Sequence, residues 1–264
     1  MAISFSPAAP WRERLSAHIG HLFTDIPFEQ RIAAAAQSGF VGVENPEPYG
    51  VPAPRMAQLL ADSGLPYVQC GVFGDSASGE KGLAAQPGRR DDFRNYLHKS
   101  LDYAAAIGCG MVHVLSGNTP DGVAPEIAWN TYLDNLGQAA DAAKSHGITI
   151  IVEAMSMPGY FVSSPLMVLE AVNAVGRDNL RMMFDVFHTT NIGLDAAETI
   201  RKGGPAIVHV HVADHPARNE PGSGSVDFAA VRLALTEIGY RGYIGCEYNP
   251  KAGTEAGLGW RDRL

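Results

Sequence analysis

The stretch from Ile148 to Glu153, with the sequence ITIIVE, is a short run of mainly β-branched apolar residues that ends in a carboxylate. Continuous apolar runs of this length are typical of parallel strands that are covered on both faces. An alanine-rich helical pattern precedes the run, and Gly147 stands between the two, where a left-handed helix cap fits. This segment therefore predicts a helix that leads into a buried parallel strand.

The same alternation extends along the rest of the chain. The predicted strands are 15–19, 41–44, 67–72, 111–115, 148–154, 182–185, 207–213 and 243–247, and the predicted helices are 27–38, 54–63, 90–107, 126–146, 164–175, 195–202 and 227–238. Eight such units predict an α/β protein with one (β/α)8 TIM-barrel domain over residues 1–264, a length typical of that fold. A doubly wound open sheet is the alternative, but no G-x-G-x-x-G follows the first strand.

Composition limits the classes of function. The formal net charge is −8, and the chain has no block of Lys or Arg that would attract phosphate backbones or anionic lipids. Neither nucleic acid nor a membrane is therefore an expected partner. No apolar run has the length of a transmembrane helix, and residues 1–14 lack a basic stretch followed by an apolar core. We expect a soluble, cytoplasmic protein.

Four of the predicted strands end in a side chain that can ligate a metal. These side chains are Glu153, Asp185, His211 and Glu247. The carboxyl ends of barrel strands meet at one mouth, and a buried carboxylate is costly unless it is paired, hydrogen-bonded or bound to a cation. Three carboxylates and one imidazole form a mostly hard-oxygen set that suits Mn²⁺, Mg²⁺ or Co²⁺. The alternative is a set of helix caps and salt bridges, which agreement among four strands disfavours.

Two further residues are predicted to face the same mouth. His188 follows Asp185 by three residues, and Arg218 lies in the polar loop 214–226, where its planar fork can hold a substrate carboxylate. The loops 74–92 and 214–226 are candidate lids or substrate loops, because loops that follow the strands form the working face of a barrel. For both residues and both loops, the alternative is an ordinary position on the solvated surface.

Other polar residues near the strand ends receive a different interpretation. His209 and His211 lie two residues apart and share one face of their predicted strand. His211 is the predicted ligand because it is nearer the carboxyl end, and His209 is predicted to be an inner histidine with satisfied hydrogen bonds. Glu44 ends the second predicted strand and is assigned no role.

Several motifs point to a known family. The most specific are GYIGCEYNP at 242–250 and TEAGLGW at 254–260. Others are LFTDIPF at 22–28, GLAAQPGR at 82–89, VEAMS at 152–156, FDVFH at 184–188 and RNEPG at 218–222. In these motifs, which span nearly the whole chain, the sequence resembles the hydroxypyruvate isomerase family of xylose-isomerase-like barrels.

The resemblance implies one divalent ion, with Glu153 and Glu247 serving both as metal ligands and as the proton-transfer pair. It implies isomerisation of hydroxypyruvate to tartronate semialdehyde through an enediolate, in which His188 and Arg218 orient the substrate. Many members carry Gln where this chain has His211, whereas related ketose 3-epimerases carry His. The resemblance also suggests a homo-oligomer.

Four other activities are compatible with the sequence. An isomerase of the four-carbon acid 2-oxo-tetronate and a ketose 3-epimerase would use the same metal and carboxylates. An abasic-site endonuclease shares the barrel but is expected to have a basic groove, which the acidic composition does not favour. A non-catalytic protein that binds a sugar acid would keep the pocket without turnover.

Overall fold

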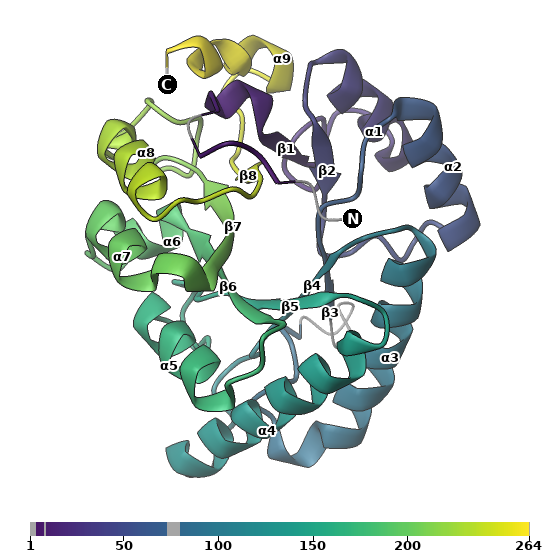
Figure 1. Cartoon of the computed structure of the whole chain (residues 1–264), viewed down its shortest axis with the longest axis vertical. Helices are drawn as coiled ribbons and strands as arrows, with labels where there is room; N and C mark the ends of the chain where they lie inside the picture. The colour runs from purple at the N-terminus through teal and green to yellow at the C-terminus, as the bar shows by residue number, and fades with distance from the viewer. Residues whose placement is uncertain (1–3, 8, 73–79, 264) are drawn as a thin grey trace.

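Eight parallel strands form one sheet that curls into a barrel, and helices surround it as an outer ring (Figure 1). The structure is a computed structural model that describes residues 4–7, 9–72 and 80–263. The strand order is β2-β1-β8-β7-β6-β5-β4-β3. An isolated parallel bridge between Val43 and Tyr67 joins the two ends of this order and nearly closes the barrel. The predicted (β/α)8 class is confirmed, and the open-sheet alternative is wrong.

Each strand overlaps its predicted run. The strands are β1 (Leu15–His18), β2 (Gly42–Glu44), β3 (Cys70–Val72), β4 (Met111–Val114), β5 (Thr149–Val152), β6 (Leu180–Asp185), β7 (Ile207–Val212) and β8 (Ile244–Cys246). The largest difference is at β3, which begins three residues later than predicted. The reason is that Tyr67 pairs with β2 only through the isolated bridge, so no ladder forms there.

The helices also follow the prediction, with two additions. The predicted helices are α1 (Phe28–Gln37), α2 (Ala53–Ser63), α3 (Arg90–Ala106), α4 (Pro125–Lys144), α5 (Pro165–Val175), α7 (Ala196–Gly203) and α8 (Phe228–Glu237). The additional helices are α6 (Val186–Asn191) and α9 (Thr254–Gly257), and 3-10 turns occupy η1 (Trp11–Glu13), η3 (Pro87–Arg89), η4 (Gly204–Ala206) and η5 (Leu258–Asp262). Gly64 and Gly239 adopt φ values of +70° and +67°, as expected of left-handed residues that end helices.

The two predicted polar loops, 74–92 and 214–226, differ in structure. Residues 74–79 of the predicted loop 74–92 lie outside the described residues. The connection ends before residue 92, because Pro87–Arg89 forms η3 and α3 begins at Arg90, where the helix was predicted to begin. The loop 214–226 is irregular, but it is not a wholly solvated excursion because Asp214 and Glu220 are buried.

Strand register brings polar side chains together at the carboxyl end of the barrel. Asp185 of β6 is paired with His211 of β7, and His211 is paired with Gly245 of β8. His18 of β1 is paired with Glu44 of β2. The buried polar side chains of these strands and the residues that follow them include His18, Glu44, His113, Glu153, Asp185, His209 and His211. Within the described part of the chain, no helix is long and apolar enough to cross a membrane.

Candidate active site

The structure brings together the four residues that the sequence predicts as metal ligands. Glu153 follows β5, Asp185 ends β6, His211 lies in β7 and Glu247 follows β8. One ligand atom from each residue can be chosen so that all four lie within 4.8 Å of one another. His211 Nδ1 is 3.8 Å from Glu153 Oε1 and 3.2 Å from Glu247 Oε2. This spacing is compatible with a single ion at the centre of the group.

Three of these four residues present buried atoms without a hydrogen-bond partner among the described residues. The atoms are Glu153 Oε1, Asp185 Oδ2 and His211 Nδ1. The other oxygen of Asp185 accepts the backbone N–H of His188 at 2.6 Å and caps α6, which leaves Oδ2 free for a ligand. Unpartnered buried carboxylate oxygens are costly, and a hard divalent cation would satisfy them. The donor set therefore fits such an ion.

The two glutamates of this group have opposite proton affinities. Burial raises the pKa of Glu153 well above its ordinary value, and the nearby carboxylates of Asp185 and Glu247 add to the effect. Burial acts on Glu247 in the same direction, but Arg218 and His211 outweigh it and hold the pKa of Glu247 well below its ordinary value. Such a split between two carboxyl groups is typical of sites that move protons.

His188 lies within the site rather than on the surface. It is buried in α6, and its Nδ1 accepts the backbone N–H of Ser156 at 3.1 Å. The ring proton of the neutral form must therefore be on Nε2, which can donate to a ligand. Burial lowers the pKa of His188, which favours this neutral form.

Arg218 also points into the site. Its Nη2 donates to Glu247 Oε2 at 2.5 Å and lies 4.0 Å from Asp185 Oδ2. Its Nε is buried and has no hydrogen-bond partner among the residues described. The backbone at Arg218 is left-handed, with φ +55°, and its carbonyl accepts the N–H of Asn249 at 2.7 Å. This hydrogen bond links the loop after β7 to the segment after β8, and it holds Arg218 beside the carboxylates of Glu247 and Asp185.

Glu44 is a member of the site that sequence reasoning missed. It is fully buried, and its Oε1 accepts a hydrogen bond from Ser16 Oγ at 2.5 Å. Its Oε2 lies 2.7 Å from His209 Nε2 and 3.1 Å from His211 Nε2. Burial would raise the pKa of Glu44, but the two histidines hold it well below its ordinary value. The signal was present in the sequence, because Glu44 ends an apolar strand as Glu153 does.

His18, at the end of β1, was missed as well. Its Nε2 is 3.4 Å from Glu247 Oε1, and neither ring nitrogen has a hydrogen-bond partner within the described ranges. Burial lowers the pKa of His18 to about 3, so the ring is neutral. His21 lies beside it, with Nδ1 3.0 Å from Asn249 Oδ1. His18 is therefore an available hydrogen-bonding group next to the proposed metal ligands.

Three overlapping groups at this end of the barrel have the spacing of metal ligands. They are Glu153, Asp185, His211 and Glu247; Glu44, His209 and His211; and His18, His21 and Glu247. In the second group the carboxylate already accepts hydrogen bonds from Ser16 and both histidines. The first group has more carboxylates and more atoms without partners, so it is the better candidate for a hard divalent ion.

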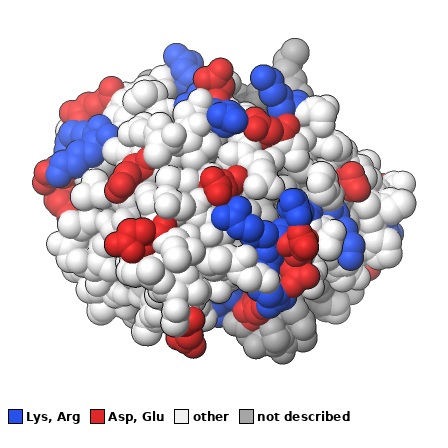
Figure 2. Space-filling model, turned by 90° about the horizontal axis from the view of Figure 1, so that it is seen from below, with Lys and Arg blue, Asp and Glu red and all other residues white. Residues whose placement is uncertain are grey.

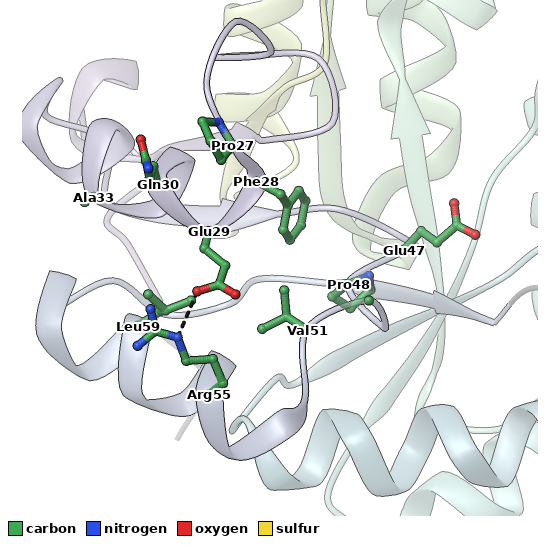
Figure 3. Close-up of a pocket in the computed structure, with 11 residues that line it drawn as sticks. Pro27, Phe28, Glu29, Gln30, Ala33, Glu47, Pro48, Val51, Arg55 and Leu59 are labelled. Atoms are coloured by element: carbon green, nitrogen blue, oxygen red, sulfur yellow. Dashed lines mark hydrogen bonds and ion pairs between the residues drawn. The ribbon is translucent and has the colours of Figure 1, made fainter.

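A separate hollow lies between α1 and α2, away from the carboxylate group. Its volume is about 750 Å³, and Phe28, Pro48 and Val51 are among its lining residues (Figure 3). An ion pair of 2.8 Å between Glu29 and Arg55 links the two helices there. None of the four proposed metal ligands lines this hollow. Its size therefore does not identify it as the reaction site.

Charges on the side of the molecule seen in Figure 2 are interleaved rather than segregated, with basic side chains next to acidic ones. Ion pairs also join neighbouring units of the outer ring: Arg177, just after α5, pairs with Asp141 of α4, and Arg201 of α7 pairs with Glu237 of α8. The face shown is not a continuous basic surface of the kind that binds nucleic acid.

Comparison with known proteins defines the class of this chain. The family described as xylose isomerase-like TIM barrel matches residues 32–264, and the chain belongs to that family. It is 38% identical to a 2-oxo-tetronate isomerase of Pectobacterium atrosepticum, an alignment that covers 94% of this chain and 97% of the relative. It is 33% identical to the hydroxypyruvate isomerase of Escherichia coli, with 94% and 98% covered. The resemblance predicted from the motifs is confirmed.

Solved structures agree with the fold. A crystal structure described as AP endonuclease, family 2, from Brucella melitensis is 36% identical and superposes with a TM-score of 0.91 over 96% of this chain and 99% of that one. A D-allulose 3-epimerase from Methylomonas sp. superposes with a TM-score of 0.77 at 22% identity, over 97% and 89%, a likeness of fold alone. With its relatives named as isomerases, this chain is an enzyme of the isomerase class.

Proposed function

We propose that the protein is a metal-dependent isomerase that moves the carbonyl group of a short 2-oxo acid from carbon 2 to carbon 3. The observation that carries this proposal is the convergence of Glu153, Asp185, His211 and Glu247 on one small volume. The unpartnered buried atoms of three of them support a cation there. When bound, a divalent ion such as Mn²⁺, Mg²⁺ or Co²⁺ would supply Lewis-acid stabilisation of the substrate oxygens.

Glu153 and Glu247 are the proposed proton-transfer pair. One glutamate would remove the proton from carbon 3, and the substrate would become an enediolate. The other would deliver a proton to carbon 2, while the hydroxyl proton leaves oxygen 3 and oxygen 2 gains one. Carbon 3 is thereby oxidised and carbon 2 reduced, with no external oxidant. The opposite shifts in the pKa values of the two glutamates support a pair in which one group accepts and the other donates.

Arg218, His188 and His18 are proposed to hold the substrate. The unpartnered Nε of Arg218 and its guanidinium fork suit a carboxylate, which a free ketose lacks. His188 can donate from Nε2 to a substrate oxygen, since its Nδ1 is occupied by Ser156. His18, in β1, has a neutral ring beside the proposed metal ligands. Neither of its nitrogens has a hydrogen-bond partner among the described residues. Arg218 in particular supports a sugar acid over the 3-epimerase alternative.

Two short acids are the candidate substrates. The sequence motifs favour hydroxypyruvate, whereas the three relatives named 2-oxo-tetronate isomerase are 37–38% identical, slightly above the 33% of the Escherichia coli hydroxypyruvate isomerase. Both acids carry a keto group at carbon 2 and a hydroxyl at carbon 3. We therefore propose this shared unit as the specificity of the site.

A substrate panel tests the proposal. EDTA-stripped protein is supplied with Mn²⁺, Mg²⁺ or Co²⁺, and hydroxypyruvate, 2-oxo-tetronate and free ketoses are followed by product identification. Metal-dependent conversion of either acid, faster than that of any ketose, is the expected result. Turnover of ketoses alone, with inversion at carbon 3, would show that the substrate is a ketose and that the proposed acid specificity is wrong.

A nuclease is a second candidate because of the name given to the Brucella melitensis structure. The interleaved charges in Figure 2 and the net charge of −8 do not favour it. Salt-sensitive binding and cleavage of a duplex that contains an abasic site would favour it, and the same stripped and reloaded protein can be used for this assay.

A further inference from the structure

Glu44 lies behind the proposed metal group rather than within it. It comes from β2, yet its Oε2 contacts two histidines of β7, at 2.7 Å for His209 Nε2 and 3.1 Å for His211 Nε2. The other oxygen accepts the hydroxyl of Ser16 in β1 at 2.5 Å. All four residues are buried, so these contacts are shielded from water. One carboxylate thus links three strands of the barrel.

These contacts determine which nitrogen of His211 is free. A carboxylate with three donors around it acts as an acceptor, so the proton of His211 that faces Glu44 is on Nε2. Burial would lower the pKa of His211, but Glu247 and Glu44 raise it, so a cation would have to displace the proton on Nδ1. Nδ1 is the atom that lies 3.8 Å from Glu153 and 3.2 Å from Glu247, and its lone pair would then face the ion. A histidine that ligates a metal commonly donates its other N–H to a carboxylate in this way, which fixes the ring and raises its basicity.

Strand β8 leaves room for this contact. Gly245 is paired with Ser16 on one side and with His211 on the other. A Cβ atom at position 245 would lie under 3.0 Å from both Glu44 Oε1 and His211 Cδ2. The absence of a side chain on Gly245 is therefore what allows a glutamate from β2 to reach across β8 to the histidines of β7.

We propose that Glu44 is a positioning residue that holds His211 with Nδ1 directed at the metal, and that Gly245 keeps the space for this contact. The inference rests on the proposed metal site. It predicts that Glu44 affects metal affinity without touching the ion.

The test is the affinity for Mn²⁺, measured by calorimetric titration of stripped protein. Glu44→Gln keeps the size of the side chain but removes its charge, and we expect Mn²⁺ to bind about 10–100-fold more weakly. Gly245→Ala should weaken Mn²⁺ binding in the same direction without changing any charge, because it pushes Glu44 and His211 apart. Glu47→Gln is the matched control, since Glu47 lies three residues further along and is exposed.

A second measurement separates positioning from a general loss of structure. In side-chain ¹H–¹⁵N spectra, the wild type and Glu47→Gln should show the Nε2–H of His211 in a strong, protected hydrogen bond. Glu44→Gln should lose that signature while its circular dichroism remains native. Wild-type affinity in a folded Glu44→Gln protein would overturn this inference and leave the metal site intact. Failure of the wild type to bind Mn²⁺ would overturn the metal site itself, and the inference with it.

Discussion

Glu44 and Glu153 are both buried glutamates at the carboxyl ends of barrel strands, and their surroundings differ. Glu44 is the last residue of β2. Its two oxygens accept hydrogen bonds from Ser16, His209 and His211. Glu153, directly after β5, has an Oε1 with no partner among the described residues. The pKa of Glu44 is held low by its two histidines, whereas that of Glu153 is raised by burial and by neighbouring carboxylates.

The difference separates a carboxylate that completes the scaffold from one that is available for a ligand. A buried charge with satisfied partners fixes the residues around it, while a buried carboxylate without partners is destabilising until a cation or a proton occupies it. The two regions share His211, whose Nε2 faces Glu44 and whose Nδ1 faces Glu153 and Glu247. His211 therefore connects the hydrogen-bonded Glu44 to the proposed metal site.

The largest expected effect is on the rate of isomerisation. Glu153→Gln and Glu247→Gln should each lower kcat by about a thousandfold, since each removes a member of the proposed proton-transfer pair. Circular dichroism should remain native, and Glu47→Gln should retain the wild-type rate. Unchanged kcat in both catalytic variants would contradict the mechanism.

Metal binding should raise thermal stability through the carboxylates that lack partners. At a Mn²⁺ concentration about 100 times Kd, the folded state should gain about 2.7 kcal/mol, and Tm should rise accordingly. Glu153→Gln should lose most of this gain when Tm is measured with and without Mn²⁺. An equal rise in Tm in Glu153→Gln would show that the stabilising ion binds elsewhere.

The free energy of unfolding should depend on pH through His113, a buried histidine. Burial lowers the pKa of His113 to about 3, so below pH 6.5 the unfolded chain binds a proton that the folded protein does not. The stability that depends on neutral His113 is complete above pH 6.5 and is lost as the pH falls toward 3. His113→Gln should reduce the loss of unfolding free energy between pH 7 and pH 5 by about 2 kcal/mol.

Urea denaturation at the two pH values measures this difference. His98→Gln is the control, because His98 is exposed on α3. An identical pH dependence in His113→Gln and the wild type would mean that His113 takes up its proton in the folded state.

The smallest expected effect is on substrate binding. Arg218→Lys keeps the positive charge beside Glu247 but replaces the planar fork by a single ammonium group. We expect KM for the 2-oxo acid to rise about tenfold, which corresponds to about 1.4 kcal/mol. Steady-state kinetics would show this, and an unchanged KM would indicate that the substrate carboxylate binds elsewhere.

The sequence predicts most of the barrel because its strands are local apolar runs that end in recognisable residues. Asp185 and Glu247 could be predicted to meet, since parallel strands all present their carboxyl ends at one mouth. The partners of Glu44 could not be predicted in the same way. Its contact with His211 depends on the curvature of the sheet, which brings β2 within reach of β7 across β1 and β8, and on the missing side chain of Gly245.

The short helix α6, which directly follows β6, could not be predicted from the pattern of apolar residues either. Asp185 caps α6 through the N–H of His188, so the chain turns directly from strand to helix and buries that histidine. An aspartate three residues before His188 is a recognisable cap, but the same aspartate was already assigned to the metal group. The geometry shows that one oxygen of Asp185 caps α6 while the other has no hydrogen-bond partner among the described residues.

We propose that one divalent ion at Glu153, Asp185, His211 and Glu247 supports isomerisation of a 2-oxo acid. The decisive experiment is a titration of stripped protein with Mn²⁺ in which both Mn²⁺ binding and the conversion of hydroxypyruvate and 2-oxo-tetronate are followed. We expect one ion per chain and activity that rises in proportion to the ion bound. Full isomerase activity in protein from which all metal has been removed would contradict it.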